Sequence, residues 1–384
     1  MEFDLSLLLL GLPIAFGLGW LASRMDIRQL KLENQQAPKA YFKGLNFLLN
    51  EQQDQAIDAF IEAVQNDPDT SELHFALGNL FRRRGEYERA VRVHQHLLSR
   101  ADLSSDDRHR AQHALALDYL KAGLLDRAEQ ALIKLEGTRF EEQARLALLA
   151  NYERSRDWAQ AADVAQRLQS SGQGQFGARL AHYLCEQAQA LESQGEENQA
   201  QALYEQAITT APDTARARMA LARLLQARGH TQKAFETLMQ AMDHAPQASP
   251  LMAPLLAQYA QTCGQTSAAL EKLLALYRGP QRSLDVLDAI VSLQEPDSPE
   301  SVRDWYVQHL EKEPSLVAAA KWIAGEKLEH EQFHPQVQRA LDHAVKPLTR
   351  YRCAACGFEA KSHFWQCPGC QTWDSYPARR VEEL

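Results

Sequence analysis

A repeat about as long as a pair of helices runs through most of this chain, and it restricts the folds that the chain can adopt. An alanine that follows a glycine or a polar turn recurs at intervals of 34, 38, 33, 39, 34 and 35 residues. These alanines are Ala56, Ala90, Ala128, Ala161, Ala200, Ala234 and Ala269. Self-similarity at this period indicates a stack of helix pairs, in which each unit buries its apolar face against its neighbours.

Other positions repeat in step with these alanines. One unit has Leu77, Phe81, Gly85 and Ala90 where the next has Leu115, Tyr119, Gly123 and Ala128. Because several offsets recur together, residues 37–283 resemble the tetratricopeptide repeat family and predict about seven helix pairs. Residues 284–349 keep a helical periodicity without this signature, and we expect degenerate helical repeats there that cap the stack.

A solenoid of helix pairs is lined on its inner surface by the first helix of each unit, and such surfaces bind partner proteins. Polar residues on these helices that the repeat core does not need are candidates for a partner groove. They are Asn79, Arg82, Arg83, His113, Gln189 and Arg223. The alternative for each of them is an ordinary solvated helix face.

The N-terminal segment predicts a membrane anchor over residues 1–23, followed by a juxtamembrane linker over residues 24–36. Residues 5–23 carry no charge and would span roughly 28 Å as a helix, close to the hydrocarbon thickness of a bilayer. The nearby basic residues all follow this run, which favours a retained single-pass helix over a cleaved signal peptide. The N-terminus would then be periplasmic and the body cytoplasmic.

Three small residues in this segment, Gly11, Ala15 and Gly19, form a ridge at four-residue spacing. Such a ridge lets two membrane helices pack closely, so it predicts a helix-pairing face. The alternative is that glycine is simply common in membrane helices.

Four cysteines near the C-terminus carry the strongest chemical signal. Cys353, Cys356, Cys367 and Cys370 read C-x2-C-x10-C-x2-C. Two residues between cysteines form a tight turn that points both sulfurs at one cation, and two such turns complete a tetrahedral thiolate shell. The sequence therefore predicts a metal-binding domain over residues 350–384, whose folding energy comes largely from the metal.

These turns resemble those of rubredoxin, which hold one iron. Two departures disfavour electron transfer: the spacer between the pairs is much shorter, and Gln371 replaces the glycine that follows the last cysteine. We expect one zinc ion in a structural role, with iron as the alternative because four thiolates accept both metals.

The remaining features argue against catalysis and against nucleic-acid binding. The formal charge of -9 disfavours contact with phosphates. An HExxH string begins at His330, but Pro335 directly follows His334 and disfavours a continuous helix that would hold zinc. We therefore predict a protein that is not an enzyme and has no catalytic residues.

The order of the three parts, an uncharged N-terminal span, a repeat array and a terminal cysteine knuckle, resembles the lipopolysaccharide assembly protein B family over the full length. The resemblance implies an inner-membrane adaptor that brings the lipid A-committing deacetylase to the membrane protease FtsH for degradation, thereby limiting lipopolysaccharide synthesis. It also implies that the four cysteines are needed for function. A general scaffold for envelope-synthesis proteins and a rubredoxin-like electron carrier are the alternatives, and homo-oligomerisation stays open.

Overall fold

The computed structural model describes residues 16, 20, 42–66, 70–279, 282–294, 299–325 and 333–384. The positions Gly11, Ala15 and Gly19 of the predicted membrane helix lie outside these residues, as do the first three residues of the HExxH string, His330 to Gln332. Within the described ranges, none of the helices has both the length and the apolar composition needed to cross a bilayer. The chain divides into two compact units, Met1–Asp157 and Trp158–Leu384.

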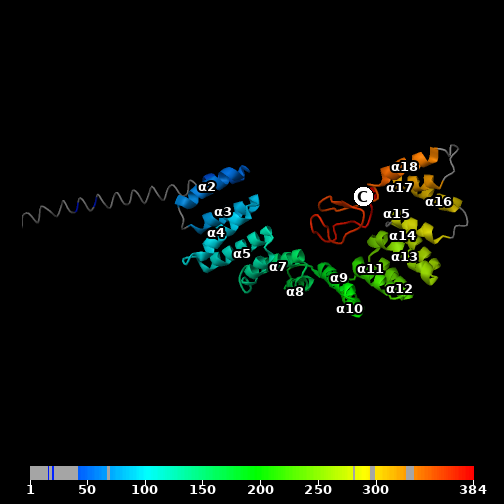
Figure 1. Ribbon diagram of the computed structural model, residues 1–384, viewed down its shortest axis with the longest axis horizontal. Coiled ribbons are helices and arrows are strands. Elements are labelled where there is room, and N and C mark those ends of the chain that lie inside the picture. Colours follow the sequence, from blue (N-terminus) through cyan, green and yellow to red (C-terminus); the bar gives the residue numbers. More distant parts are fainter. Residues whose placement is uncertain are drawn as a thin grey trace, which may run out of the picture. The chain divides into compact units, whose positions relative to one another are not determined.

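The first unit is built of helices that pack in chain order (Figure 1). A helix over residues 42–49 is followed by α2 (Gln53–Asn66), α3 (Ser71–Arg84), α4 (Tyr87–Ser99), α5 (Ser105–Ala122), α6 (Leu125–Ile133) and α7 (Glu141–Ser155). Each helix from α2 onward contacts the next, as expected of stacked helix pairs.

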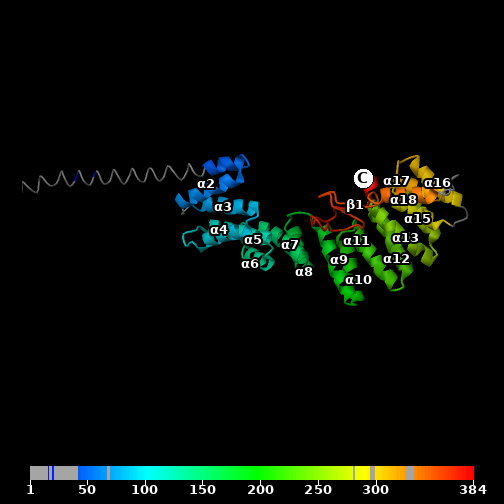
Figure 2. The same ribbon diagram turned by 45° about the horizontal axis from the view of Figure 1, so that its top comes forward.

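The second unit continues the pattern and ends in a small irregular domain (Figure 2). Its helices are α8 (Trp158–Ser170), α9 (Gly177–Ser193), α10 (Glu197–Thr210), α11 (Ala215–Ala227), α12 (Thr231–His244), η1 (Pro246–Ala248), α13 (Ser249–Cys263), α14 (Thr266–Arg278), α15 (Leu284–Leu293), α16 (Pro299–Leu310), α17 (Leu316–Ala324) and α18 (His334–Val345). The terminal domain contains β1 (Tyr351–Arg352), β2 (Glu359–Ala360) and η3 (Val381–Glu383).

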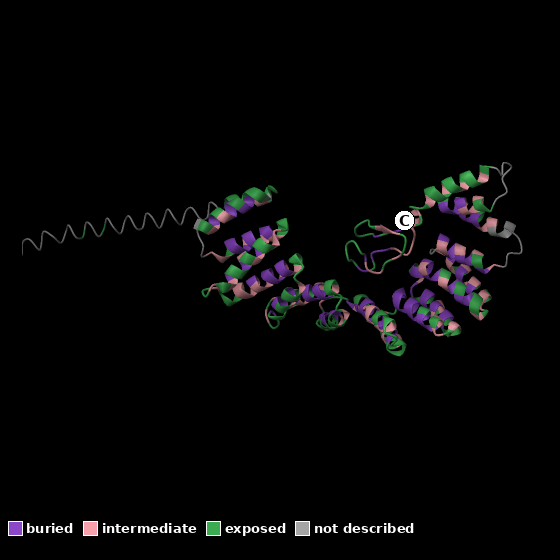
Figure 3. Ribbon diagram, in the orientation of Figure 1, coloured by how far each residue is buried: buried purple, intermediate pink, exposed green. Residues whose placement is uncertain are grey.

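The seven repeating alanines explain why the helices can approach so closely. All seven lie on the second helix of a pair, α2, α4, α6, α8, α10, α12 or α14, and each has 0% of its surface exposed. A larger side chain at any of these positions would force the neighbouring helix outward. The predicted tetratricopeptide architecture is confirmed, with buried residues along the inner sides of the helices (Figure 3).

The turn inside each pair needs a residue with left-handed backbone geometry. Gly85 ends α3 with φ of 84°, and its N–H donates to the carbonyls of Arg82 and Phe81. Gly123 closes α5 with φ of 77°. Arg156 holds the equivalent place after α7 with φ of 59°. An arginine at this turn therefore adopts a backbone conformation that glycine adopts with less strain.

Candidate metal centre and its contact with the repeats

The two cysteine turns of the terminal domain have the same local geometry. In the first, β1 pairs with β2 in an antiparallel hairpin, and the N–H of Gly357 donates to the carbonyl of Cys353 at 2.9 Å. In the second, the N–H of Gln371 donates to the carbonyl of Cys367 at 2.8 Å. The residue after each turn is left-handed, with φ of 78° at Gly357 and 60° at Gln371. The second turn therefore holds a side chain in a conformation that suits glycine.

The four sulfurs form a shell of the right size for one metal ion. All four Sγ atoms lie within 4.8 Å of one another. The Sγ atoms of Cys353 and Cys370 are 3.8 Å apart, and those of Cys356 and Cys367 are 3.7 Å apart. A tetrahedron with Zn–S bonds of about 2.3 Å has edges of about 3.8 Å, so the shell fits a tetrathiolate ion. The predicted metal ligands thus come together, and the geometry does not distinguish zinc from iron.

The surroundings of the sulfurs shift the pKa values of Cys353 and Cys356 in opposite directions. Burial alone would raise the pKa of Cys353, but hydrogen bonds with Ser375 and with the backbone of Cys356 and Ala355 lower it to about 6. A backbone hydrogen bond from Phe358 lowers the pKa of Cys356, yet burial and the other three sulfurs raise it to about 12. Four thiolates this close repel one another, and a bound cation removes that repulsion.

The metal domain docks on the repeats of the second unit through Trp373. Its side chain is only 7% exposed. The ring stacks on His182 of α9 at 4.7 Å between centroids and meets Trp158 of α8 edge-on at 6.0 Å. Tyr183 lies edge-on at 5.9 Å, and the guanidinium of Arg216 on α11 lies 5.7 Å from the ring. Three repeat helices thus enclose one indole of the metal domain.

The next residue, Asp374, adds a directional contact. Both of its carboxylate oxygens lie 2.9 Å from Nε2 of His182, while Nδ1 of His182 lies 3.4 Å from Nη1 of Arg216. A guanidinium can only donate, so Nδ1 accepts and the proton of the imidazole sits on Nε2, facing Asp374. This tautomer is assigned from the hydrogen-bonding network.

The C-terminal tail fastens the metal domain to the last helices of the same unit. Arg380 forms a bidentate pair with Asp285 at 2.9 and 3.1 Å. Glu383 accepts from the N–H of Leu284 at 2.5 Å, and Glu382 accepts from the N–H of Leu316 at 2.5 Å. The tail thereby caps the N-termini of both α15 and α17, where backbone donors have no partner inside the helix.

All six predicted groove residues lie on the first helices of their pairs, α3, α5, α9 and α11. Two of them belong to an internal network of the first unit. Arg82 donates to Asn79 Oδ1 at 2.5 Å and to Asp118 Oδ1 at 2.8 Å. Asp118 is fully buried, and its second oxygen lies 2.5 Å from Nδ1 of the equally buried His94. Arg82 and Asn79 therefore have a structural role whether or not they also contact a partner.

The other four groove candidates are less constrained. His113 is half-buried and stacks on Phe140 at 5.4 Å, and burial together with the charge of Arg82 lowers its pKa. Gln189 accepts a hydrogen bond of 3.4 Å from Arg216. Arg83 and Arg223 are exposed. The structure spreads the six residues over both units, and their partner-binding role stays a prediction.

The sequence analysis did not single out the residues that receive the metal domain, which include Trp158, His182, Arg216 and Asp285. A signal for two of them was present. His182 and Arg216 occupy helix positions that are 1% and 5% exposed, and polar side chains in such places need a partner. For His182 that partner is Asp374, 192 positions later in the chain, whereas Arg216 donates to Glu186 of α9 at 2.6 Å and also lies over the ring of Trp373.

The fold and the site together define a tetratricopeptide repeat protein with a C-terminal rubredoxin-type metal domain. A family model described as rubredoxin metal binding domain matches residues 351–376, and tetratricopeptide repeat models match residues 73–109 and 191–259. Lipopolysaccharide assembly protein B of Escherichia coli K12 is 31% identical and covers 99% of this chain and 100% of its own length. The chain belongs to the lipopolysaccharide assembly protein B family.

The chain is also similar to a second relative and to one solved structure. The protein of the same name from Haemophilus influenzae is 28% identical over 97% of both chains. The C-terminal part of a tetratricopeptide repeat-containing protein from Cytophaga hutchinsonii is 11% identical with a TM-score of 0.42, covering 65% of this chain and 99% of that one.

Proposed function

We propose that this protein is an adaptor of the bacterial inner membrane that limits lipopolysaccharide synthesis. In this proposal it brings the lipid A-committing deacetylase to an FtsH-type membrane protease for degradation. The full-length relationship to proteins named lipopolysaccharide assembly protein B carries the proposal. The repeat architecture supports it, since stacked helix pairs offer extended surfaces to partner proteins.

The proposal includes a single-pass anchor over residues 1–23, with its uncharged run at residues 5–23, a periplasmic N-terminus and a cytoplasmic body. An uncharged run of this length, followed by basic residues, supports this orientation. The short linker that follows would keep the repeats beside the membrane, where a membrane protease and its substrate meet. Gly11, Ala15 and Gly19 would then face another membrane helix.

The metal in this proposal is one zinc ion held by Cys353, Cys356, Cys367 and Cys370. Its role is structural, because the residues around the site bind the repeats. Trp373 enters the repeat stack, and the tail caps two of its helices. A protein that lost the metal would lose the order of this domain and the surface that the domain completes.

Deletion of residues 1–23 tests the adaptor function in cells. We expect the deacetylase to accumulate, as measured by immunoblotting, because the truncated protein no longer meets the membrane protease. A matched variant that replaces the segment with an unrelated single-pass helix separates anchoring from helix pairing. Unchanged deacetylase levels in the deletion strain would contradict the proposal.

Affinity purification of the full chain from membranes, followed by mass spectrometry, tests the partners. Recovery of both the protease and the deacetylase supports the adaptor. Recovery of several envelope-synthesis enzymes without a protease would favour a general scaffold instead. Stoichiometric iron with reversible reduction in the purified protein would favour electron transfer.

A further inference from the structure

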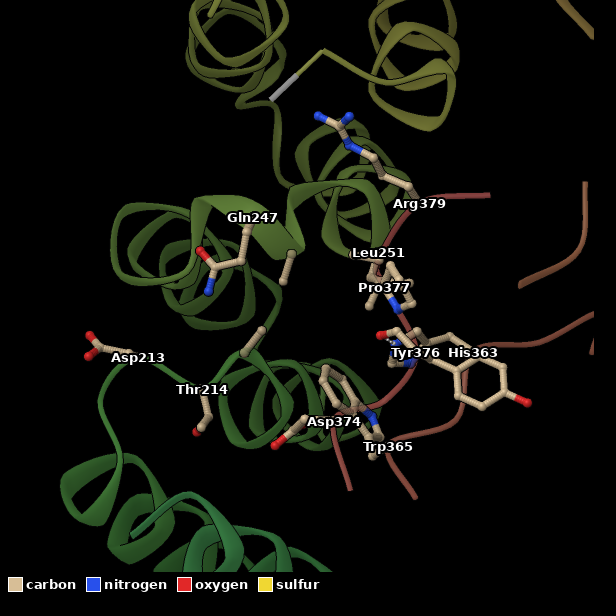
Figure 4. Close-up of a pocket in the computed structure, with 13 residues that line it drawn as sticks. Asp213, Thr214, Gln247, Leu251, His363, Trp365, Asp374, Tyr376, Pro377 and Arg379 are labelled. Atoms are coloured by element: carbon tan, nitrogen blue, oxygen red, sulfur yellow. Dashed lines mark hydrogen bonds between the residues drawn. The ribbon is translucent and has the colours of Figure 1, made fainter. Parts of the chain in front are cut away.

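A pocket of about 480 Å³ lies where the metal domain meets the repeats of the second unit (Figure 4). Its volume falls in the range of small-ligand sites. One wall comes from the repeats, at the start of α11 and around η1 and α13, and the other comes from the metal domain between His363 and Arg379. Neither module forms this pocket alone.

The walls of the pocket are largely apolar. Leu251 of α13, Ala248 of η1 and Pro377 of the metal domain contribute aliphatic surface, and Trp365 contributes an indole ring. Trp365 is held in place by neighbouring rings, with His363 edge-on at 4.7 Å and His182 at 6.0 Å. An indole fixed in this way offers a face to an aliphatic chain or to a cation.

Two carboxylates border the pocket, one from each module. Asp213 precedes α11, is exposed, and forms no salt bridge with any residue that the structure describes. The side chain of Asp374 is 47% exposed, and among the described residues its carboxylate is bonded to His182, which leaves other lone pairs of its oxygens open to solvent. In Figure 4 both residues lie at the same side of the pocket, with Thr214 between them.

Of the positive groups near the pocket, Arg218 of α11 interacts electrostatically with Asp213, but it is buried, donates to the carbonyl of Pro212 and does not line the pocket. Burial lowers the pKa of His363 below its ordinary value, so that ring is neutral near pH 7. Arg379 lies at the opposite end of the pocket in Figure 4, where its positive charge favours the ionised form of Glu383. The end of the pocket nearest Trp365 therefore combines acidic groups with an aromatic face, which suits a cation on an aliphatic stem.

We propose that this composite pocket binds an arginine or lysine side chain in a peptide segment of a partner protein. The aliphatic stem would pack against Leu251 and Trp365, and the charged head would lie between Asp213 and Asp374. The pocket is open to solvent, so a side chain of another protein can enter it. The inference deepens the proposed function, because it names a place where the adaptor holds a partner.

The shape of the pocket depends on the metal, because the metal domain supplies one of its walls. Seven of its thirteen lining residues belong to the metal domain, which depends on the four cysteines for its fold. The pocket should exist only in the metal-loaded protein, so partner binding there would report metal occupancy.

Capped pentapeptides provide the test, with arginine, lysine, glutamate or leucine at the centre and alanine elsewhere. Binding to the full-length, metal-loaded chain in detergent is measured by calorimetry and by ligand-observed NMR. We expect the arginine and lysine peptides to bind at least about fivefold more tightly than the other two. Equal binding of all four peptides, or no binding of any at millimolar concentration, would overturn the proposal.

Two variants and one treatment locate the site. Asp213→Lys should weaken the arginine peptide at least about fivefold, whereas Glu271→Lys, the same charge change at an exposed position of α14 outside the pocket, should not. Removal of the metal with a chelator should abolish binding. Equal effects of the two substitutions, or full binding after chelation, would refute the composite pocket. No deacetylase or protease is present in these assays, so this inference can fail while the proposed function stands.

Discussion

Replacement of Trp373 by alanine should separate the metal domain from the repeats without releasing the metal. A tryptophan side chain covers 150–250 Å², and Trp373 is 7% exposed. At about 25 cal/mol per Å² its burial contributes roughly 4–6 kcal/mol, and measured Trp→Ala changes in cores cost about 3–5 kcal/mol. We expect a loss of about 4 kcal/mol in docking, which is close to a thousandfold change in the equilibrium constant between the docked and undocked domain.

The assay for this change is hydrogen exchange of the full chain, combined with metal analysis. Amides of the metal domain and of α9 and α11 should exchange faster in Trp373→Ala, because the contact that protects them is weakened. The metal content should stay at one ion per chain, since the four sulfur ligands are untouched. Trypsin should also cleave near Arg380 more quickly.

Phe364→Ala is the matched control. Phe364 is another aromatic residue of the same domain, but it is 37% exposed, and within the described part of the chain its ring meets that of Tyr376 at 6.0 Å. Its removal should cost about 1 kcal/mol or less. Equal effects of the two substitutions would refute the reasoning, and so would loss of the metal from Trp373→Ala.

Three further predictions follow from the site and from the core of the first unit. Gln371→Gly should slow metal release to a chelator by up to about fivefold, because it removes about 1 kcal/mol of left-handed strain; release at the unchanged or a faster rate would contradict this. Cys367→Ser together with Cys370→Ser should remove the metal, as measured by elemental analysis, and should also abolish control of the deacetylase in cells. Asp118→Ala should lower the free energy of unfolding of the first unit in urea by about 3–5 kcal/mol, because buried His94 loses its partner. Adding His94→Leu should recover part of that loss, and strictly additive effects would show that the two side chains are not coupled.

The helix pairs could be predicted from the sequence because their determinants are local and repeated. Ala90 and Ala128, for example, meet the same requirement for close approach in successive units. The metal ligands could also be predicted, since two residues between cysteines suffice to aim both sulfurs at one point. In both cases a short spacing carries the structural information.

The docking of the metal domain could not be predicted in this way. His182 and Asp374 are 192 positions apart, and no local spacing connects them. The role of Arg82 was hidden for a similar reason. Its position on α3 predicts a groove residue, but its guanidinium bonds Asp118 on α5, 36 positions later. A single sequence shows that such a side chain is polar, but it does not show whether solvent, a partner or a distant part of the chain satisfies it.

The tail explains why the repeat signature can fade after α14 while the helices persist. The first three N–H groups of α17 are all satisfied, two by Glu382 and the third, that of Ala318, by Ser315. At α15 the N–H of Leu284 is satisfied by Glu383. Carboxylates at helix N-termini stabilise helices by about 0.5–2 kcal/mol each. At α15 and α17 this stabilisation replaces part of the packing that the repeating alanines provide in α2 to α14. Because the same tail continues from the metal domain, the end of the repeat stack depends on residues that the cysteine site holds in position.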